Sequence, residues 1–230
     1  MDKWIRELQP GIVINNRYGV RQYGDFLTPE GEIGAYNTKD PWETNYTLNG
    51  SWGYVPNPPR SLRTCIQLLM QTVTGDGNFL LNVGPRADGT MPEDQVERLK
   101  EIGEQLDVFG EAVYGTRGGP FVNDKTGGMT YRGNILYVHI WDWPENSITL
   151  PDLKANILNV SSLTAKQLQY EIRDQSNLTF SVSAADRLAV NTVIRVELDR
   201  PVSEISSDAV WRVNCERESF NHAIIVEKKV

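Results

Sequence analysis

Histidine and cysteine are scarce in this sequence, with two of each among 230 residues. Cys65 and Cys215 form no C-x-x-C pair, and His139 and His222 are equally isolated. Zinc and iron–sulfur sites draw on clustered thiolates and imidazoles, so the sequence argues against both. The same scarcity leaves little material for a Ser-His-Asp triad or a Cys-His dyad. Any chemistry must therefore rest on carboxylates, arginine and aromatic side chains.

Positive charge is also in short supply. The chain has 23 Lys+Arg against 30 Asp+Glu, a formal net charge of −7 and a pI near 5.0. Nothing here would neutralise a run of phosphates, so we expect no nucleic-acid partner. The apolar stretches are too short to span a bilayer, and the first residues do not resemble a signal peptide. We therefore expect no membrane partner, and the compartment stays open.

The first half of the chain, residues 1–118, alternates short apolar runs with stretches of helical periodicity. Helices are expected at residues 2–8, 61–74 and 92 to about 110, and buried strands at 11–15 and 79–83. This order is typical of an α/β fold. Two strand–helix units cannot close a barrel, because a (β/α)₈ barrel takes about 250 residues. Residues 1–118 are therefore predicted to be the C-terminal portion of a barrel of this type.

The second half, residues 119–230, contains strand after strand with no convincing long helix. Expected strands lie at residues 128–132, 135–141, 147–150, 155–160, 167–173, 178–182 and 192–198, with further candidates at 210–213 and 223–226. Spacing of about ten residues with turn residues between is typical of a β-sandwich. The predicted fold class is thus α/β followed by all-β, with an antiparallel β-sandwich as the second domain.

Candidate functional residues follow the first expected strand. In barrels the active site lies at the carboxyl ends of the strands, which points to Arg17. An arginine there can bind vicinal hydroxyls or a carboxylate with two hydrogen bonds. A surface ion pair with a neighbouring acid is the competing interpretation, and spacing alone favours it.

A long polar segment, from Val20 to Pro59, is predicted to be a loop and combines acids with aromatic residues. It holds Glu30, Glu32 and Glu43 among several tyrosines and tryptophans. Aromatic faces stack on the apolar faces of sugars, and a carboxyl group shielded by them can serve as a general acid. Simple solvation of these acids is the alternative. The aromatic density favours a binding site, although it does not name a sugar.

Several segments, taken in order, resemble the C-terminal part of the α-L-fucosidases of glycoside hydrolase family 29. They are NNRYG at 15–19, GDFLTPE at 24–30, WET at 42–44, NGSWGY at 49–54, GNFLLNVGP at 77–85, DGT at 88–90 and GEAVYGT at 110–116. Each piece is weak alone, but the ordered set is highly specific. The resemblance covers about residues 1–118. The remainder is similar only in being a β-rich C-terminal domain.

The resemblance implies a retaining mechanism, in which an aspartate forms a covalent fucosyl-enzyme and a second carboxyl group acts as acid and then as base. Retaining pairs stand about 5–5.5 Å apart. In the family the nucleophile follows an earlier strand in a Trp-x-Asp type segment, and none precedes Gly11. The chain is therefore expected to be a fragment that lacks the nucleophile.

Site residues are carried over from the resemblance position by position. Glu30 matches the acid/base of one branch of the family and Glu43 that of another; Glu30 is the favoured acid/base, with Glu43 in the pocket. Arg17 matches an arginine that binds fucose. Trp52 matches an aromatic against the sugar, suited to its C6 methyl, and Trp42 is grouped with it as substrate-binding.

Asn82 is expected to hold loop backbone rather than to touch the sugar.

The leading hypothesis is an exo-acting retaining α-L-fucosidase, of which this chain is the C-terminal part. It would act on terminal α-L-fucosyl linkages of a glycan or glycoconjugate and need no metal or organic cofactor. A non-catalytic carbohydrate-binding protein and an inactive fragment are the alternatives. Linkage preference, aglycone and oligomeric state stay open.

Overall fold

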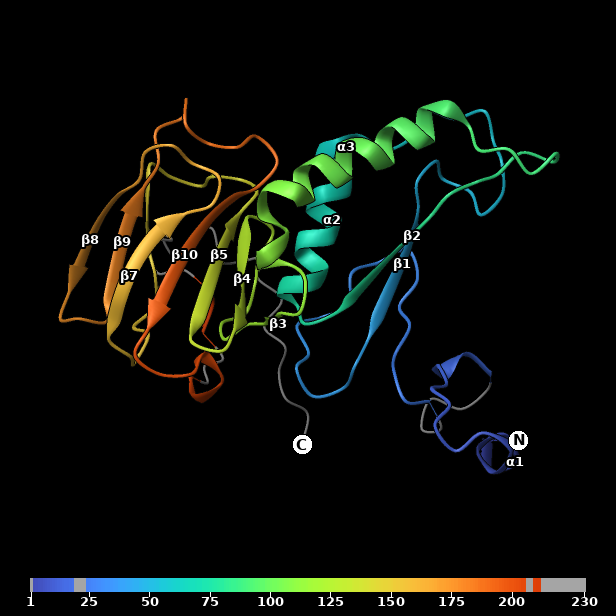
Figure 1. Cartoon of the computed structure of the whole chain (residues 1–230), viewed down its shortest axis with the longest axis horizontal. Helices are drawn as coiled ribbons and strands as arrows, with labels where there is room; N and C mark the ends of the chain where they lie inside the picture. Colours follow the sequence, from blue (N-terminus) through green and yellow to red (C-terminus); the bar gives the residue numbers. More distant parts are fainter. Residues whose placement is uncertain (1, 19–23, 206–208, 212–230) are drawn as a thin grey trace. The chain divides into compact units, whose positions relative to one another are not determined.

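The computed structural model describes residues 2–18, 24–205 and 209–211 (Figure 1). The chain folds as two compact units, Met1–Gly119 and Pro120–Val230. Of the strands expected near the C-terminus, residues 212–213 and 223–226 lie outside the described residues. No helix among the described residues is long and apolar enough to cross a membrane.

Parallel pairing organises the first unit. Strand β1 (Glu43–Thr47) runs parallel to β2 (Asn78–Asn82), with Glu43 opposite Asn78 and Thr47 opposite Asn82. On the other side of β1, single parallel bridges join Leu27 to Trp42 and Glu30 to Asn45. A further parallel bridge joins Asn15 to Phe26. Four stretches of chain therefore run side by side in the same direction.

Two expectations for this unit are corrected. β1 lies inside the segment predicted to be a loop, because its sequence Glu-Thr-Asn-Tyr-Thr lacks the apolar pattern by which buried strands are recognised. Its backbone is satisfied by pairing on both sides instead. Conversely, the strand expected at 11–15 is reduced to the bridge at Asn15. The strand expected at 79–83 is confirmed as β2, one residue earlier.

The three expected helices are present as α1 (Asp2–Leu8), α2 (Leu62–Thr74) and α3 (Glu93–Phe109). The Ser61 hydroxyl caps α2 by accepting a hydrogen bond from the Thr64 amide at 3.1 Å. Pro92 precedes α3, whose first turn is acidic, as the helix dipole favours. The described residues of this unit also form the 3₁₀ turns η1 (Asn16–Tyr18) and η3 (Gly110–Ala112) and the strand β3 (Arg117–Gly118).

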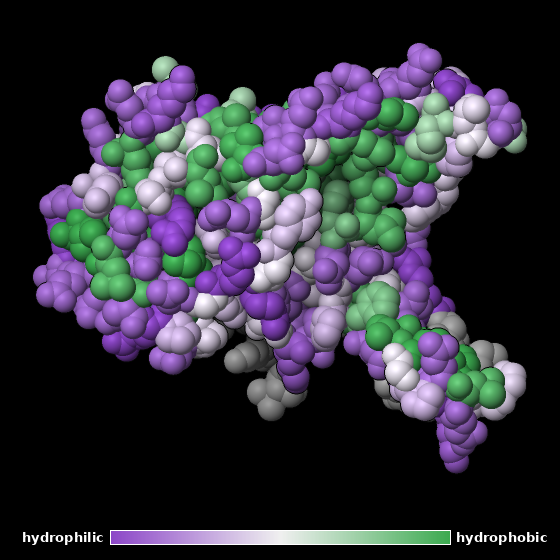
Figure 2. Space-filling model, in the orientation of Figure 1, coloured by the Kyte–Doolittle hydropathy of each residue, from purple (hydrophilic) through white to green (hydrophobic). Residues whose placement is uncertain are grey.

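Several large apolar side chains of the first unit are exposed to solvent. Trp4, Leu8 and Val13 near the amino end are 63–71% exposed, and Val108 on α3 is 51% exposed. Figure 2 shows apolar surface beside α3. Large apolar side chains gathered at a surface are typical of a region that packs against further protein.

The second unit is built from two antiparallel sheets. One runs in the order β4-β5-β10-β7, and the other in the order β6-β9-β8 (Figure 1). The strands are β4 (Gly127–Arg132), β5 (Ile135–Ile140), β6 (Ser147–Thr149), β7 (Ile157–Ser162), β8 (Gln169–Arg173), β9 (Asn177–Ser181) and β10 (Thr192–Leu198), followed by the 3₁₀ turn η4 (Val202–Glu204). All seven strands expected between residues 128 and 198 are confirmed.

A single hydrophobic core joins the two sheets. Met129, Leu136 and Ile194 come from the first sheet, and Ile148 and Phe180 from the second. Each is at most 1% exposed. β6 and β9 alternate buried with partly exposed residues, whereas β4 and β5 are buried on both faces over most of their length.

Candidate active site

The strand register places Glu30 and Glu43 on one face of the parallel sheet. Trp42 points to the side of the sheet where α2 ends, since its indole Nε1 donates to the Gly75 carbonyl at 3.2 Å. Side chains alternate along a strand, so Glu43 and Asn45 project from the opposite face. Glu30 is bridged to Asn45 in parallel and shares that face. The side chains of both candidate acids therefore project from the same face of the parallel sheet.

The two acids lie at different positions along the strand direction. Because Glu30 is level with Asn45, Glu43 stands two residues nearer the amino end, which is about 6–7 Å at the rise of a strand. Active sites of barrels lie at the carboxyl ends of their strands. Glu30 therefore lies nearer than Glu43 to the carboxyl end of the parallel strands.

Arg17 and Glu30 are brought together directly. Arg17 Nη1 donates to Glu30 Oε2 in an ion pair whose side chains are both a little over 40% exposed. The guanidinium is also held by Thr28, with Nε donating to Oγ1 at 3.0 Å and Nη2 to the carbonyl at 3.2 Å. Thr28 Oγ1 in turn donates to Asn16 Oδ1 at 2.7 Å. The ion pair that spacing favoured does form, and its acid is the candidate acid/base itself.

Asp25 aligns the two segments that carry this pair. Its carboxylate accepts the Ile14 amide at 2.8 Å and both oxygens accept Arg6 Nη2 at 3.0 Å. The Ile14 hydrogen bond, followed by the Arg6 hydrogen bond, holds the pKa of Asp25 below its ordinary value. Asp25 thereby fixes the backbone just before Asn15 against the segment that leads to Glu30.

The loop after β1 carries the exposed aromatics. Trp52 is 51% exposed and Tyr54 is 47% exposed. Asn82, at the carboxyl end of β2, donates from Nδ2 to the carbonyl of Trp52 at 3.1 Å and to that of Ser51 at 3.5 Å. The prediction that Asn82 holds loop backbone is confirmed.

Trp42 is placed differently from the other predicted site residues. Its side chain is 2% exposed and packs against backbone at Gly34, Gly75 and Gly77. A Cβ atom at Gly77 would lie 2.4 Å from the indole ring. In this structure Trp42 packs in the core of the first unit, and neither face of its ring is exposed for contact with a sugar.

Two residues near Glu30 were not singled out from the sequence. Thr28 holds Arg17 by accepting two hydrogen bonds from its guanidinium. Its position two residues before Glu30, on the same extended segment, was the sequence signal that could have identified it. Asn45, level with Glu30, is 8% exposed, and within the described structure its Oδ1 has no hydrogen-bond partner. A buried amide oxygen beside the candidate acid is suited to receive a hydroxyl group.

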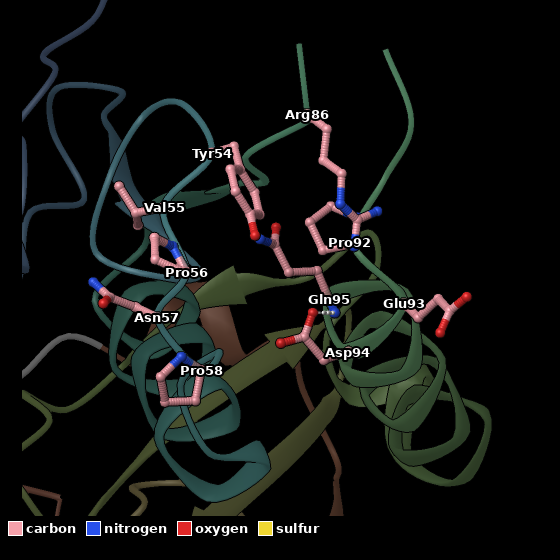
Figure 3. Close-up of a pocket in the computed structure, with 10 residues that line it drawn as sticks. All are labelled: Tyr54, Val55, Pro56, Asn57, Pro58, Arg86, Pro92, Glu93, Asp94 and Gln95. Carbon is pink, nitrogen blue, oxygen red and sulfur yellow. Dashed lines mark hydrogen bonds between the residues drawn. The ribbon is translucent and has the colours of Figure 1, made fainter. Parts of the chain in front are cut away.

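A pocket of about 530 Å³ lies beside the aromatic loop, between Tyr54, Arg86 and the start of α3 (Figure 3). The Arg86 guanidinium stands 5.7 Å from the centroid of the Tyr54 ring, and its Nη1 donates to the Met91 carbonyl at 3.0 Å. Gln95, also in the lining, fixes the Gly84 amide at 2.9 Å. The five predicted site residues are not among the described residues that line this pocket.

No group of three or more histidine, cysteine, aspartate or glutamate residues within 2–18, 24–205 and 209–211 could hold a metal ion. The groups gathered at the site are the carboxyl groups of Glu30 and Glu43, the Arg17 guanidinium, neighbouring amides and hydroxyls, and exposed aromatic rings.

Comparison with known sequences gives one consistent family. The family model of α-L-fucosidase matches residues 1–111. The α-L-fucosidase of Dictyostelium discoideum is 30% identical over 152 residues, and the tissue α-L-fucosidase of Homo sapiens is 31% identical over 151. Each alignment covers 60% of this chain and 32% of the relative. The chain thus spans about a third of the length of the curated relatives it matches.

Solved structures agree with the sequences. α-L-fucosidase isoenzyme 1 from Paenibacillus thiaminolyticus superposes with a TM-score of 0.73 at 29% identity, over 86% of this chain and 52% of that one. The α-L-fucosidase of Vibrio sp. strain EJY3 gives 0.75 at 29% identity, over 86% of this chain and 37% of that one. Residues 1–111 therefore match the α-L-fucosidase family, and the chain is similar to a part of that family's members.

Proposed function

We propose that this chain forms part of an exo-acting retaining α-L-fucosidase of glycoside hydrolase family 29, which hydrolyses terminal α-L-fucosyl linkages in glycans. The observation that carries the proposal is the Arg17–Glu30 pair at the carboxyl end of parallel segments, in a chain that matches this family. In this proposal the substrate is a fucosylated glycan or glycoconjugate. An α-fucosidase of Thermotoga maritima, 27% identical with a TM-score of 0.62, has been solved in complex with fucose.

We assign the first unit to the C-terminal portion of a (β/α)₈-type barrel and the second to a β-sandwich. Four parallel stretches flanked by α2 and α3 support the first assignment. The exposed apolar side chains of that unit also support it, because further barrel segments would cover them. Two antiparallel sheets on one core support the second assignment.

Glu30 is the proposed acid/base. In the first step its proton passes to the glycosidic oxygen as the bond from the fucose C1 breaks and a carboxylate nucleophile bonds to C1. In the second step water attacks C1, its proton passes to Glu30, and the ester to the nucleophile breaks. We assign no residue of this chain to the nucleophile, which the whole enzyme would supply as an aspartate.

Arg17 and Trp52 are the proposed sugar contacts. Thr28 fixes the plane of the Arg17 guanidinium, and a guanidinium so held can bind two hydroxyl groups at once. The exposed indole of Trp52 offers an apolar face suited to the C6 methyl of fucose. Glu43 lies on the same face as Glu30 and is the alternative acid/base.

Replacing Arg17 with lysine in the whole enzyme is expected to lower kcat/KM for fucosides by about 10–100-fold. Lysine keeps the positive charge but lacks the paired N–H donors of the guanidinium. The loss of one or two charge-assisted hydrogen bonds lowers kcat/KM by about this factor. Steady-state kinetics would measure the effect. Arg173→Lys is the matched control, since Arg173 also forms an exposed ion pair, with Glu171. Equal rates for the two variants would contradict a role for Arg17 in binding.

Replacing Asn82 with alanine is expected to raise KM by about fivefold with a smaller change in kcat. The substitution removes the hydrogen bonds that hold the Trp52 loop, each worth about 1 kcal/mol. Asn78→Ala is the control, because Asn78 lies on the same face at the other end of β2. A control that raised KM as much as Asn82→Ala would show that strand β2, not the loop, sets KM.

The experiment that tests the proposed function is substitution of Glu30 in the complete enzyme. Hydrolysis rates are measured with natural fucosides and with aryl fucosides that carry good leaving groups, in the absence and presence of azide.

A further inference from the structure

The three-stranded sheet of the second unit has a polar outer face. Leu178 and Phe180 on β9, and Ile148 on β6, are at most 1% exposed and point into the core. The residues between and beside them point the other way, because side chains alternate along a strand. That outer face is therefore open to solvent rather than to the core.

The register sets three polar side chains in a row across this face. Ser147 on β6 lies opposite Ser181 on β9, which lies opposite Gln169 on β8. One step along, the hydroxyls of Thr149 and Thr179 are 2.9 Å apart. Neighbouring strands stand about 4.8 Å apart, so the row presents hydroxyl and amide groups at a regular spacing.

The three residues of this row line a pocket of about 380 Å³. Besides Ser147, Ser181 and Gln169, its polar lining includes Asn146, Gln167 and Ser183. Each of these six side chains carries a hydroxyl or an amide and no charge. Hydroxyls and amides both donate and accept hydrogen bonds, which matches the hydroxyl groups of a sugar. The volume lies within the range of about 300–1,000 Å³ that is usual for ligand pockets.

The loop after β9 forms one wall of this pocket, and side-chain hydrogen bonds hold the loop in place. Ser183 Oγ donates to Asp186 Oδ2 at 2.7 Å, and Arg187 Nε donates to the Val182 carbonyl at 3.0 Å. The Arg187 guanidinium stands 4.1 Å from the centroid of the Trp143 ring, and that ring packs edge-on against Phe180 of the core. Asp186 and Arg187 also balance each other in charge, so the pocket as a whole has no strong preference for an ion.

We propose that this pocket binds a neutral oligosaccharide, independently of the Arg17–Glu30 site. The six uncharged hydrogen-bonding side chains, their row across one sheet face, and the balanced charges of the wall all favour a hydroxyl-rich ligand without charge. The site would hold the protein on a glycan surface without cleaving it. It requires no residue of the first unit, and it can exist whether or not the proposed hydrolysis is correct.

The test uses the full chain, labelled with ¹⁵N, and three neutral probes that carry no fucose: lactose, N-acetyllactosamine and chitobiose. Amide shifts are followed while each probe is added to millimolar concentration, with a heparin disaccharide as the anionic comparison. We expect at least one neutral probe to shift the amides of Ser147, Gln169 and Ser181. The absence of such shifts with all three, or shifts with the heparin disaccharide alone, would overturn the proposal.

A pair of variants locates the binding. Gln167→Ala/Gln169→Ala removes two exposed amides of the pocket and is expected to weaken binding about tenfold. Glu171→Ala is the control, since it lies on the same strand and face, one step away from the pocket. Arg17→Ala is expected to leave binding unchanged. Equal weakening by the control, or weakening by Arg17→Ala instead, would place the ligand elsewhere and reject the proposed site.

Discussion

Glu30→Ala in the complete enzyme is expected to slow the hydrolysis of natural fucosides by about 10²–10⁴-fold, which is the usual contribution of a general acid/base. The loss should fall on kcat and kcat/KM together, because the proton is transferred in the transition state. Hydrolysis of aryl fucosides with good leaving groups should fall much less, since such groups depart without protonation. Steady-state kinetics on the two substrate types would measure the difference.

Azide gives a second readout of the same role. In the second step the variant lacks the base that activates water, and azide attacks the covalent intermediate without one. Added azide is therefore expected to restore turnover of the aryl substrate and to yield fucosyl azide. A residue that only supported the fold would show no such rescue.

Glu43→Ala is the matched control, because Glu43 projects from the same face two residues nearer the amino end. It should keep the ratio between natural and aryl substrates close to that of the unaltered enzyme, and azide should have no effect. If Glu43→Ala shows the substrate dependence and the rescue while Glu30→Ala does not, the acid/base is Glu43. The register argument for Glu30 would then be wrong.

The seven strands of the second unit between residues 128 and 198 and the three helices of the first were predictable because each carries a local signal. β6 and β9 alternate buried and partly exposed side chains, with Ile148 and Phe180 beside polar neighbours. α3 follows a proline and begins with two acids. β1 had no such signal, because its face toward Glu30 is polar and its partners lie far along the chain.

The candidate site was predictable in its residue types but not in its geometry. Sequence spacing indicated that Arg17 pairs with an acid, yet which acid depends on the parallel bridge between Asn15 and Phe26. Aromatic density indicated a binding loop, but it could not tell the exposed Trp52 from the buried Trp42. The difference arises from three glycines that make room for the Trp42 ring, and these meet it only in the folded unit.

Gly77→Ala is expected to destabilise the first unit by about 3 kcal/mol, the upper part of the usual range for overpacking a core. A Cβ atom there would lie 2.4 Å from two atoms of the Trp42 ring, which is itself held by its hydrogen bond to Gly75. Neither the ring nor the backbone can withdraw without losing that bond. Urea unfolding, followed through the amide signals of β1 and β2, would measure the loss.

Gly103→Ala is the matched control and should have the opposite sign. Gly103 lies within α3, and an added Cβ atom would meet nothing within 4 Å. Alanine there should stabilise the helix by about 0.5–1 kcal/mol, because glycine loses more backbone entropy on folding. A double variant with Trp42→Phe separates the causes: the smaller ring relieves the clash, so Gly77→Ala should cost less in that background than alone. Strict additivity would show that the glycine is needed for its backbone and not for the space it leaves to Trp42.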